Sequence, residues 1–116
     1  MLSSLIQQLK ANTTFQTGFW YLSDHGESTG ESGMYLHGAP YAIAPTQQTH
    51  IPMLMWFSAE WSKQNSAQMT CLAQQKSKEL SQDNLFPSLL SLLDVKTQVI
   101  DEKHNMLQQC QLKTKA

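Results

Sequence analysis

Charged residues are scarce in this sequence. They make up 15% of its 116 residues, and the formal net charge is -1 with a pI near 6.4. Proteins that bind the phosphate backbone of nucleic acid present a strongly basic surface. The composition therefore argues against nucleic acid as a partner.

Long hydrophobic runs are also absent. The longest unbroken apolar stretch is Met53–Phe57, whereas a helix that spans a bilayer needs about 18 apolar residues. The first ten residues carry their only cation at Lys10, the reverse of a secretory signal, in which positive charge precedes the apolar segment. The sequence as written predicts neither a transmembrane helix nor an export signal.

Only two cysteines are present, Cys71 and Cys110. They could form one disulfide, remain as two buried thiols, or pair with residues outside the chain, and the sequence leaves these alternatives open. The length is that of a single domain with one modest core.

Hydrophobic patterning predicts two helices and two strands. Apolar residues at positions 2, 5, 6 and 9 have helical spacing and predict a short helix that packs against a sheet. The runs Phe19–Leu22 and Ile51–Phe57 predict buried strands. Ser81 is placed to cap a helix over Gln82–Leu93, with Asp83 in the first turn, where a carboxylate suits the helix dipole.

The remaining segments predict less regular structure. Gly26–Pro45 holds four of the five glycines and two prolines, which predicts a long functional loop. Trp61–Lys78 is polar and predicts a surface excursion, Val95–Ile100 predicts a short strand, and Gln111–Ala116 predicts a frayed end. Together these elements predict an α/β fold with a partial mixed sheet flanked by helices.

The first predicted strand ends in an adjacent acid and imidazole, Asp24 and His25. Sheets of α/β proteins place ligand sites at the carboxyl ends of their strands, and both side chains are good zinc ligands. The alternative is an Asx turn or helix cap beside a solvated histidine.

The loop that follows supplies further polar groups. Glu27 lies two residues after His25, and a Gly-rich segment returns a second imidazole at His37. Convergence of these groups would create one site with three or four polar side chains, whereas an exposed histidine bonded to a carbonyl is the alternative for His37. His50 and His104 are expected to be a capping or loop residue and a tail residue, not ligands.

These motifs resemble those of the phosphoethanolamine transferases of the alkaline phosphatase and sulfatase superfamily. The resemblance rests on Tyr21-Leu22-Ser23-Asp24-His25-Gly26-Glu27-Ser28, Tyr35-Leu36-His37-Gly38, Pro40-Tyr41, Ile43-Ala44-Pro45, Gln48, His50-Ile51-Pro52-Met53, Trp56 and Ser81-Gln82-Asp83-Asn84-Leu85-Phe86. It spans roughly residues 18 to 110. It implies that residues 1–116 are the carboxy-terminal part of a sulfatase-like catalytic domain.

The resemblance implies a role for each candidate residue. Asp24 and His25 correspond to two ligands of the catalytic zinc, and His37 to a histidine that contacts the phosphoethanolamine group or a second zinc. Glu27 is expected to orient a ligand from the second shell. The family's zinc activates a threonine nucleophile, which takes phosphoethanolamine from phosphatidylethanolamine and passes it to a lipid A phosphate.

The resemblance also implies what this segment does not supply. The family's threonine nucleophile, its glutamate zinc ligand and its membrane helices lie upstream, and Thr13 and Thr14 match no nucleophile motif. The chain alone is therefore expected to be inactive, and its membrane association to depend on those helices. The family acts at the periplasmic face of the inner membrane and confers resistance to cationic peptides such as colistin.

Two alternatives to this interpretation remain. Sulfatases share a similar Asp-His-Gly turn, but they usually have a lysine where this chain has His37, and the Pro40 to Pro45 block also fits the transferases better. The second alternative is a non-catalytic remnant of a transferase.

Overall fold

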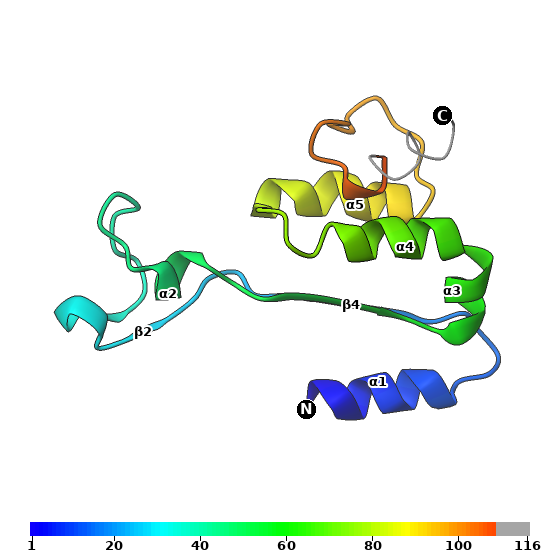
Figure 1. Ribbon diagram of the computed structural model, residues 1–116, viewed down its shortest axis with the longest axis horizontal. Coiled ribbons are helices and arrows are strands. Elements are labelled where there is room, and N and C mark those ends of the chain that lie inside the picture. The colour runs from blue at the N-terminus through cyan, green and yellow to red at the C-terminus, as the bar shows by residue number, and fades with distance from the viewer. Residues whose placement is uncertain (109–116) are drawn as a thin grey trace. The chain divides into compact units, whose positions relative to one another are not determined.

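The computed structural model describes residues 1–108, which fall into two compact units, Met1–Trp61 and a second that begins at Ser62. Figure 1 labels the helices and strands along the chain. The first unit contains α1 (Leu2–Ala11), β1 (Gly18–Leu22), β2 (Ser28–Thr29), the 3-10 turn Glu31–Gly33, β3 (Tyr35–Leu36), α2 (Thr46–Thr49) and β4 (Met53–Phe57).

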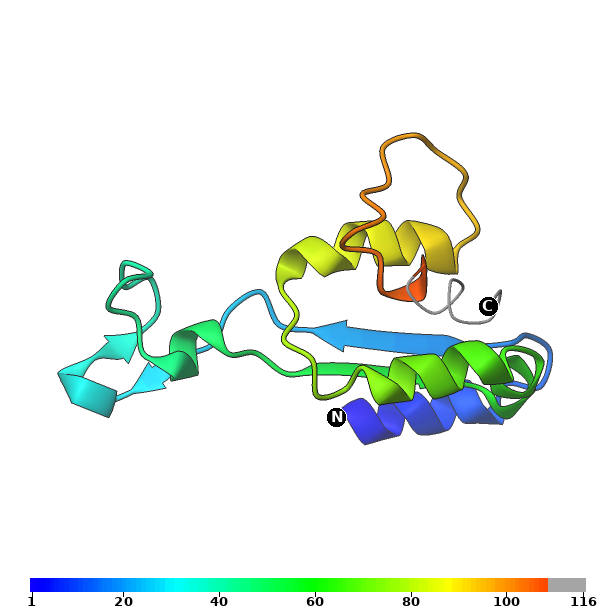
Figure 2. The same cartoon turned by 45° about the horizontal axis from the view of Figure 1, so that its top comes forward.

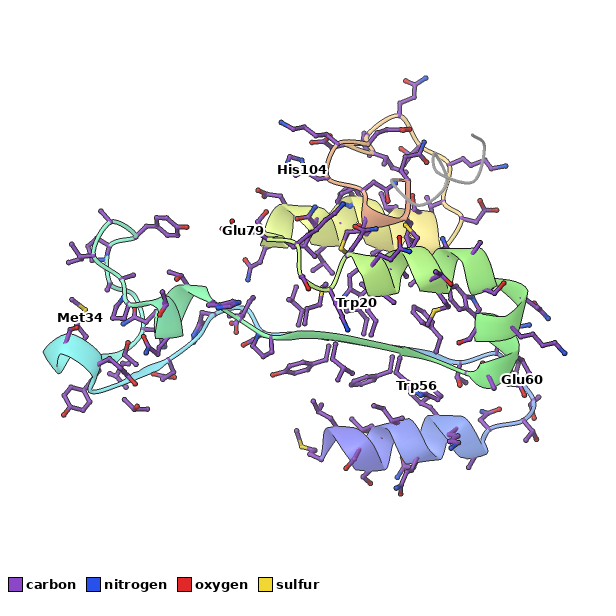
Figure 3. The ribbon with its side chains drawn as sticks, viewed as in Figure 1. Trp20, Met34, Trp56, Glu60, Glu79 and His104 are labelled. Carbon is purple, nitrogen blue, oxygen red and sulfur yellow. The ribbon has the colours of Figure 1, made fainter. Side chains whose placement is uncertain are left out.

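A long two-stranded ribbon forms the frame of the first unit. β1 and β4 pair antiparallel from Gly18 opposite Phe57 to Leu22 opposite Met53. Successive side chains of a strand point to opposite faces, and Figure 3 shows Trp20 and Trp56 on opposite faces of the ribbon. The aromatic residues of both strands pack well on such a pleated, half-buried surface, which explains why these runs form strands.

Helix α1 follows the face of the ribbon on which Trp56 lies (Figures 1 and 3). Its apolar stripe is half-buried at Leu2, Ile6 and Leu9. The Thr17 hydroxyl donates to the Leu9 carbonyl at 3.1 Å, which fixes the connection from helix to strand. The predicted helix is therefore confirmed, and so is its position against a sheet.

Beyond β1 the chain forms a second, much shorter hairpin. β2 and β3 pair antiparallel through only two residues each, Ser28 opposite Leu36 and Thr29 opposite Tyr35. Figure 2 shows this hairpin next to α2. The tip is closed by Glu31, whose carboxylate accepts from the Thr29 amide at 2.7 Å and the Thr29 hydroxyl at 3.0 Å. Hydrogen bonds from the Glu31 amide and from Thr29 lower the pKa of Glu31.

The second unit is helical. It contains α4 (Ser66–Gln74), the 3-10 turn Gln82–Asn84 and α5 (Leu85–Leu92), while α3 (Ala59–Gln64) spans the boundary between units. Ser81 caps the turn as predicted: its hydroxyl accepts from the Asp83 amide at 3.2 Å, and its own amide donates to the Asn84 side chain at 2.8 Å. Such reciprocal bonds satisfy backbone donors that a helix start leaves unpaired.

The structure confirms the α/β class and both long strands, with three corrections. Within residues 1–108 both sheets are antiparallel rather than one mixed sheet, because the two long strands run in opposite directions. The segment predicted as a surface excursion, Trp61–Lys78, contains most of α3 and all of α4. Val95–Ile100 forms no strand and runs as a loop with a turn, and it pairs with neither of the two sheets among the described residues.

Two further expectations need qualification. The strand predicted as buried at Ile51–Phe57 is partly exposed, since Met53 and Leu54 retain 38% and 40% of their accessible surface. Cys71 is disulfide-bonded. Cys110 and Gln111–Ala116 lie outside the described residues.

Candidate metal centre

The short hairpin brings the predicted site residues together. Glu27 directly precedes β2 and His37 directly follows β3. Because Ser28 pairs with Leu36, the antiparallel register places these two flanking residues opposite each other. His25 lies in the loop between β1 and β2. The Gly-rich segment therefore returns the second imidazole to the first, as the sequence predicted.

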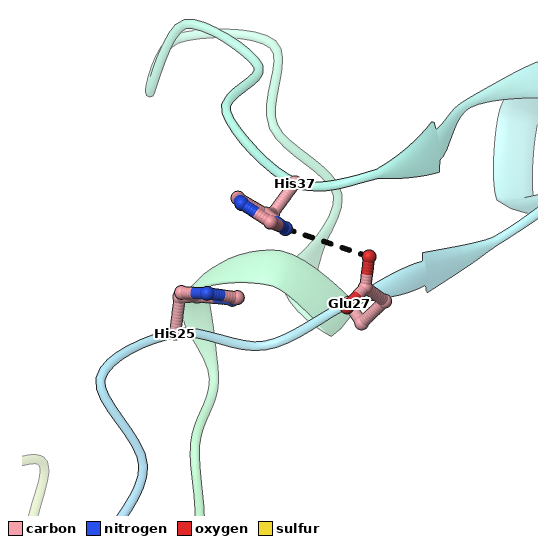
Figure 4. A group of neighbouring side chains, drawn as sticks. All are labelled: His25, Glu27 and His37. Atoms are coloured by element: carbon pink, nitrogen blue, oxygen red, sulfur yellow. Dashed lines mark hydrogen bonds and ion pairs between the residues drawn. The ribbon is translucent and has the colours of Figure 1, made fainter.

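Figure 4 shows His25, Glu27 and His37 facing one another. The two imidazole rings are stacked, with centroids 3.9 Å apart and planes inclined by 28°. His37 Nδ1 lies 3.5 Å from Glu27 Oε1. One potential ligand atom from each of the three residues can be chosen so that all lie within 4.8 Å of one another, and all three residues are exposed.

Hydrogen-bond partners assign the proton on each ring. His25 Nδ1 lies 2.8 Å from the Gly26 carbonyl oxygen, which can only accept, so Nδ1 carries the proton. His37 Nδ1 is likewise placed to donate to the Glu27 carboxylate. In a neutral ring with its proton on Nδ1, the Nε2 atom offers a lone pair to a metal ion. A carboxylate that orients a ligating histidine through its other nitrogen is a common feature of metal sites.

Asp24 lies beside this cluster rather than within it. Its Oδ2 atom is 3.8 Å from His25 Nε2, and its Oδ1 atom accepts the His25 amide at 3.0 Å. Two atoms bound to one tetrahedral zinc at about 2.0–2.1 Å each lie about 3.4 Å apart. The separation of 3.8 Å is close to this value, so a small side-chain adjustment lets Asp24 and His25 bind one ion.

A close backbone approach fixes His25 in the loop. The Gly26 amide donates to the Gln48 carbonyl at 3.0 Å. A Cβ atom at Gly26 would lie 1.9 Å from the Gln47 carbonyl oxygen, so only glycine allows this contact between the loop and α2. In β3, the strand that leads to His37, Leu36 adopts a φ of 65°, which turns the chain just before His37.

The described residues therefore form a solvent-accessible cluster of two imidazoles and one carboxylate, with the Asp24 carboxylate beside it. Imidazole and carboxylate are donors typical of zinc and of similar divalent metals. His50 and His104 are not part of it, in line with the sequence analysis. One residue with a role in the site was not anticipated, Gln48, which contacts both arms of the loop. It was noted only as part of a motif, since a single glutamine carries no periodic signal.

The fold and this cluster define an α/β chain whose loop after the first strand brings together three side chains that could hold a metal ion. The sulfatase family profile matches residues 1–95. The chain belongs to the sulfatase family.

Within this family the chain is similar to phosphoethanolamine transferases. It is 48% identical over 97 residues to phosphoethanolamine transferase EptA of Escherichia coli K12, a match that covers 83% of this chain and 18% of that protein. The soluble domain of lipooligosaccharide phosphoethanolamine transferase A from Neisseria meningitidis superimposes with a TM-score of 0.84 and 41% identity, covering 94% of this chain and 33% of that one.

A second solved structure gives the same result. The C-terminal periplasmic domain of phosphoethanolamine transferase EptC from Campylobacter jejuni superimposes with a TM-score of 0.78 and 46% identity, over 91% of this chain and 33% of that one. These matches confirm the resemblance found in the sequence. The chain spans less than a fifth of the curated relative and a third of each solved domain. No helix among residues 1–108 is long and apolar enough to cross a membrane.

Proposed function

We propose that this chain forms the metal-binding and phosphate-handling part of a phosphoethanolamine transferase that acts on lipid A. The main observation behind this proposal is that ligand atoms of His25, Glu27 and His37 lie within 4.8 Å of one another. The chain is also 48% identical over 97 residues to such a transferase. The proposed donor is phosphatidylethanolamine and the proposed acceptor is a lipid A phosphate. Both follow from the resemblance to relatives.

The proposed metal is zinc, with Asp24 and His25 as two of its ligands. Bound zinc would act as a Lewis acid that lowers the pKa of a nucleophilic hydroxyl and offsets negative charge on the phosphoryl oxygens. The Gly26 carbonyl keeps the proton of His25 on Nδ1 and so leaves Nε2 available. Exposure of both side chains gives the ion and a lipid headgroup access from solvent.

His37 and Glu27 are proposed to handle the transferred group. The Glu27 carboxylate holds the His37 ring so that Nε2 faces away from Glu27, where it can contact a phosphoryl oxygen or a second ion. The carboxylate at Glu27 and the imidazole at His37 are also suited to the cationic amine and the anionic phosphate of phosphoethanolamine.

The nucleophile is proposed to come from another part of the transferase. Thr13 and Thr14 lie before β1 and match no nucleophile motif, so we expect no transfer by these 116 residues alone. The proposed location of the whole enzyme is the inner membrane, with this site on the periplasmic side. Amine-bearing groups on lipid A phosphates would weaken binding of cationic peptides such as colistin.

A segment exchange tests this function. The chain would replace the matching 97 residues of Escherichia coli EptA in a strain that lacks its own phosphoethanolamine transferases. Mass spectrometry of lipid A should then show added phosphoethanolamine, which is lost with Asp24→Ala or His25→Ala. The exported 116-residue chain alone should give none.

His50→Ala is the matched control in the exchanged enzyme. His50 is an exposed histidine that follows α2 and lies outside the cluster, so its removal should leave lipid A modification intact. Modification that survives His25→Ala would contradict the proposed role of the site, and modification by the chain alone would show that it contains a nucleophile.

A further inference from the structure

Gln48 lies buried between the two arms of the metal centre. It belongs to α2 and retains 8% of its accessible surface. Its side chain makes two hydrogen bonds: Nε2 donates to the Ser28 hydroxyl at 2.9 Å, and Oε1 accepts from the Ala39 amide at 3.2 Å. Its backbone carbonyl accepts from the Gly26 amide at 3.0 Å.

Each of these three bonds joins Gln48 to a residue that lies within two positions of His25, Glu27 or His37 in the sequence. Gly26 lies between His25 and Glu27, Ser28 follows Glu27, and Ala39 is two residues after His37. One residue therefore ties the arm that carries His25 and Glu27 to the arm that carries His37. We infer that Gln48 is a positioning residue, which holds the imidazoles of His25 and His37 against each other and thereby sets the metal affinity of the site. The metal part of this inference rests on the proposed function.

The hairpin by itself is too short to hold these arms. β2 and β3 pair through two residues each, and even a longer isolated two-stranded hairpin is only marginally stable in water. The bond between Gln48 and Ser28 is shielded from solvent, since Ser28 retains only 2% of its accessible surface, and the bond to Ala39 is partly buried. Shielded hydrogen bonds do not compete with water and fix geometry more firmly than exposed ones.

The amide group is chemically suited to this role. Its NH2 group can only donate and its carbonyl oxygen can only accept, and each of these two atoms makes a hydrogen bond, so neither polar atom of the side chain is left without a partner. A glutamate at this position could keep both bonds, because a serine hydroxyl can also donate. An alanine would lose both. Gln48 does not need to touch the ion to affect its binding.

The test measures the ring contact without metal and the zinc affinity separately. Nuclear Overhauser effects between the His25 and His37 rings report their stacking in the metal-free chain, and calorimetric titration with zinc chloride reports affinity. Gln48→Ala should abolish the ring contact and weaken zinc binding at least about 10-fold, a typical effect of removing a supporting residue of a metal site. Gln48→Glu should retain the ring contact, and Ser28→Ala should weaken it in part.

Gln47→Ala is the matched control, because Gln47 is the exposed neighbour in the same helix and, within residues 1–108, its side chain bonds to Thr46 alone, at 3.3 Å. Ring contact and zinc affinity should both be unchanged. An unchanged ring contact in Gln48→Ala would overturn the inference. Loss of the β1 and β4 amide signals in that variant would also overturn it, since Gln48 would then support folding in general.

The two proposals fail in different ways. If the unmodified chain binds no zinc but Gln48→Ala still separates the rings, the proposed metal function is wrong and the positioning role stands. If zinc binds through Asp24 and His25 but is insensitive to Gln48→Ala, the positioning role is wrong and the metal function stands.

Discussion

Leu36 adopts a backbone conformation that is unfavourable for its residue type. Its φ of 65° lies in the left-handed region, which costs a residue with a branched side chain about 1–2 kcal/mol. The side chain gains little in return, since it retains 67% of its accessible surface. Leu36 directly precedes His37, so this strain accompanies the turn that brings the second imidazole to the site.

Leu36→Asn should therefore stabilise the first unit by about 0.5–1 kcal/mol, because asparagine adopts left-handed conformations more readily. Urea unfolding followed by tryptophan fluorescence measures this change, as all three tryptophans lie in that unit. Tyr35→Asn is the control: Tyr35 is 70% exposed and has an ordinary φ. Equal effects of the two changes would contradict the account.

Asp101 and His104 form an exposed acid and imidazole pair outside the cluster of His25, Glu27 and His37. His104 Nδ1 lies 2.7 Å from Asp101 Oδ2, and this hydrogen bond lowers the pKa of Asp101 below its ordinary value of 3.8. A lowered pKa means that folding favours the carboxylate. Its stabilising contribution is present above the ordinary value and is lost as the pH falls through the lowered one.

His104→Ala should raise the pKa of Asp101 towards its ordinary value, because the main hydrogen bond to the carboxylate is removed. Carbon-detected nuclear magnetic resonance of the aspartate carboxyl between pH 2 and about 6 covers this range. His50→Ala should leave the pKa of Asp101 unchanged. An unchanged pKa of Asp101 in His104→Ala would show that the hydrogen bond is absent in solution.

At the scale of the elements, the site depends on how closely α2 approaches the loop after β1. The Gly26 Cα lies against the backbone of Gln47 and Gln48, so an added methyl group would meet main-chain atoms rather than a movable side chain. Backbone contacts of this kind cannot relax without moving one of the two segments. The glycine is therefore needed for its small size rather than for its φ.

Gly26→Ala should destabilise the first unit by about 1–3 kcal/mol, as overpacking commonly does, and should separate His25 from His37. Loss of the nuclear Overhauser effects between their rings would show this. Gly33→Ala is a suitable comparison, because its φ of +74° is strained by a side chain but nothing lies within 4 Å of an added Cβ. It should lower stability and leave the rings in contact; separation of the rings in both variants would contradict the steric explanation.

The elements with a strong apolar pattern could be predicted from the sequence, and the others could not. The stripe of α1, the aromatic run of β1 and the Ser81 cap before α5 are local signals, and each was confirmed. α4 has no such stripe, because glutamine, serine and threonine fill most of its exposed positions. Val95–Ile100 has strand-forming residues, but a strand also needs a partner, which is a tertiary property.

The candidate site, too, could be predicted from the sequence only in part. That Asp24 and His25 follow a strand and that His37 returns close to them could be predicted from the sequence. The ring stacking and the role of Gln48 could not, because they depend on the register of a four-residue hairpin and on where α2 docks. Hydrogen bonds between segments 20 residues apart leave no periodic trace in a sequence.

At the scale of the whole molecule, the described residues bury few hydrophobic side chains. Those with less than a tenth of their surface exposed are Phe57, Cys71, Met106 and Leu107. A small core leaves modest stability, so an ion that binds only the folded loop should stabilise the first unit noticeably. Protons compete with metal for imidazole nitrogens, so this stabilisation should weaken at acidic pH.

The most direct test of the account is calorimetric titration of the 116-residue chain with zinc chloride at neutral pH. One ion should bind weakly, because two protein ligands leave most of its coordination sphere to water. The double change Asp24→Ala and His25→Ala should abolish this binding, whereas Asp101→Ala with His104→Ala, which removes an exposed acid and imidazole pair outside the candidate site, should not affect it. Zinc binding that survives the first pair of changes, or that is lost only with the second, would contradict the account.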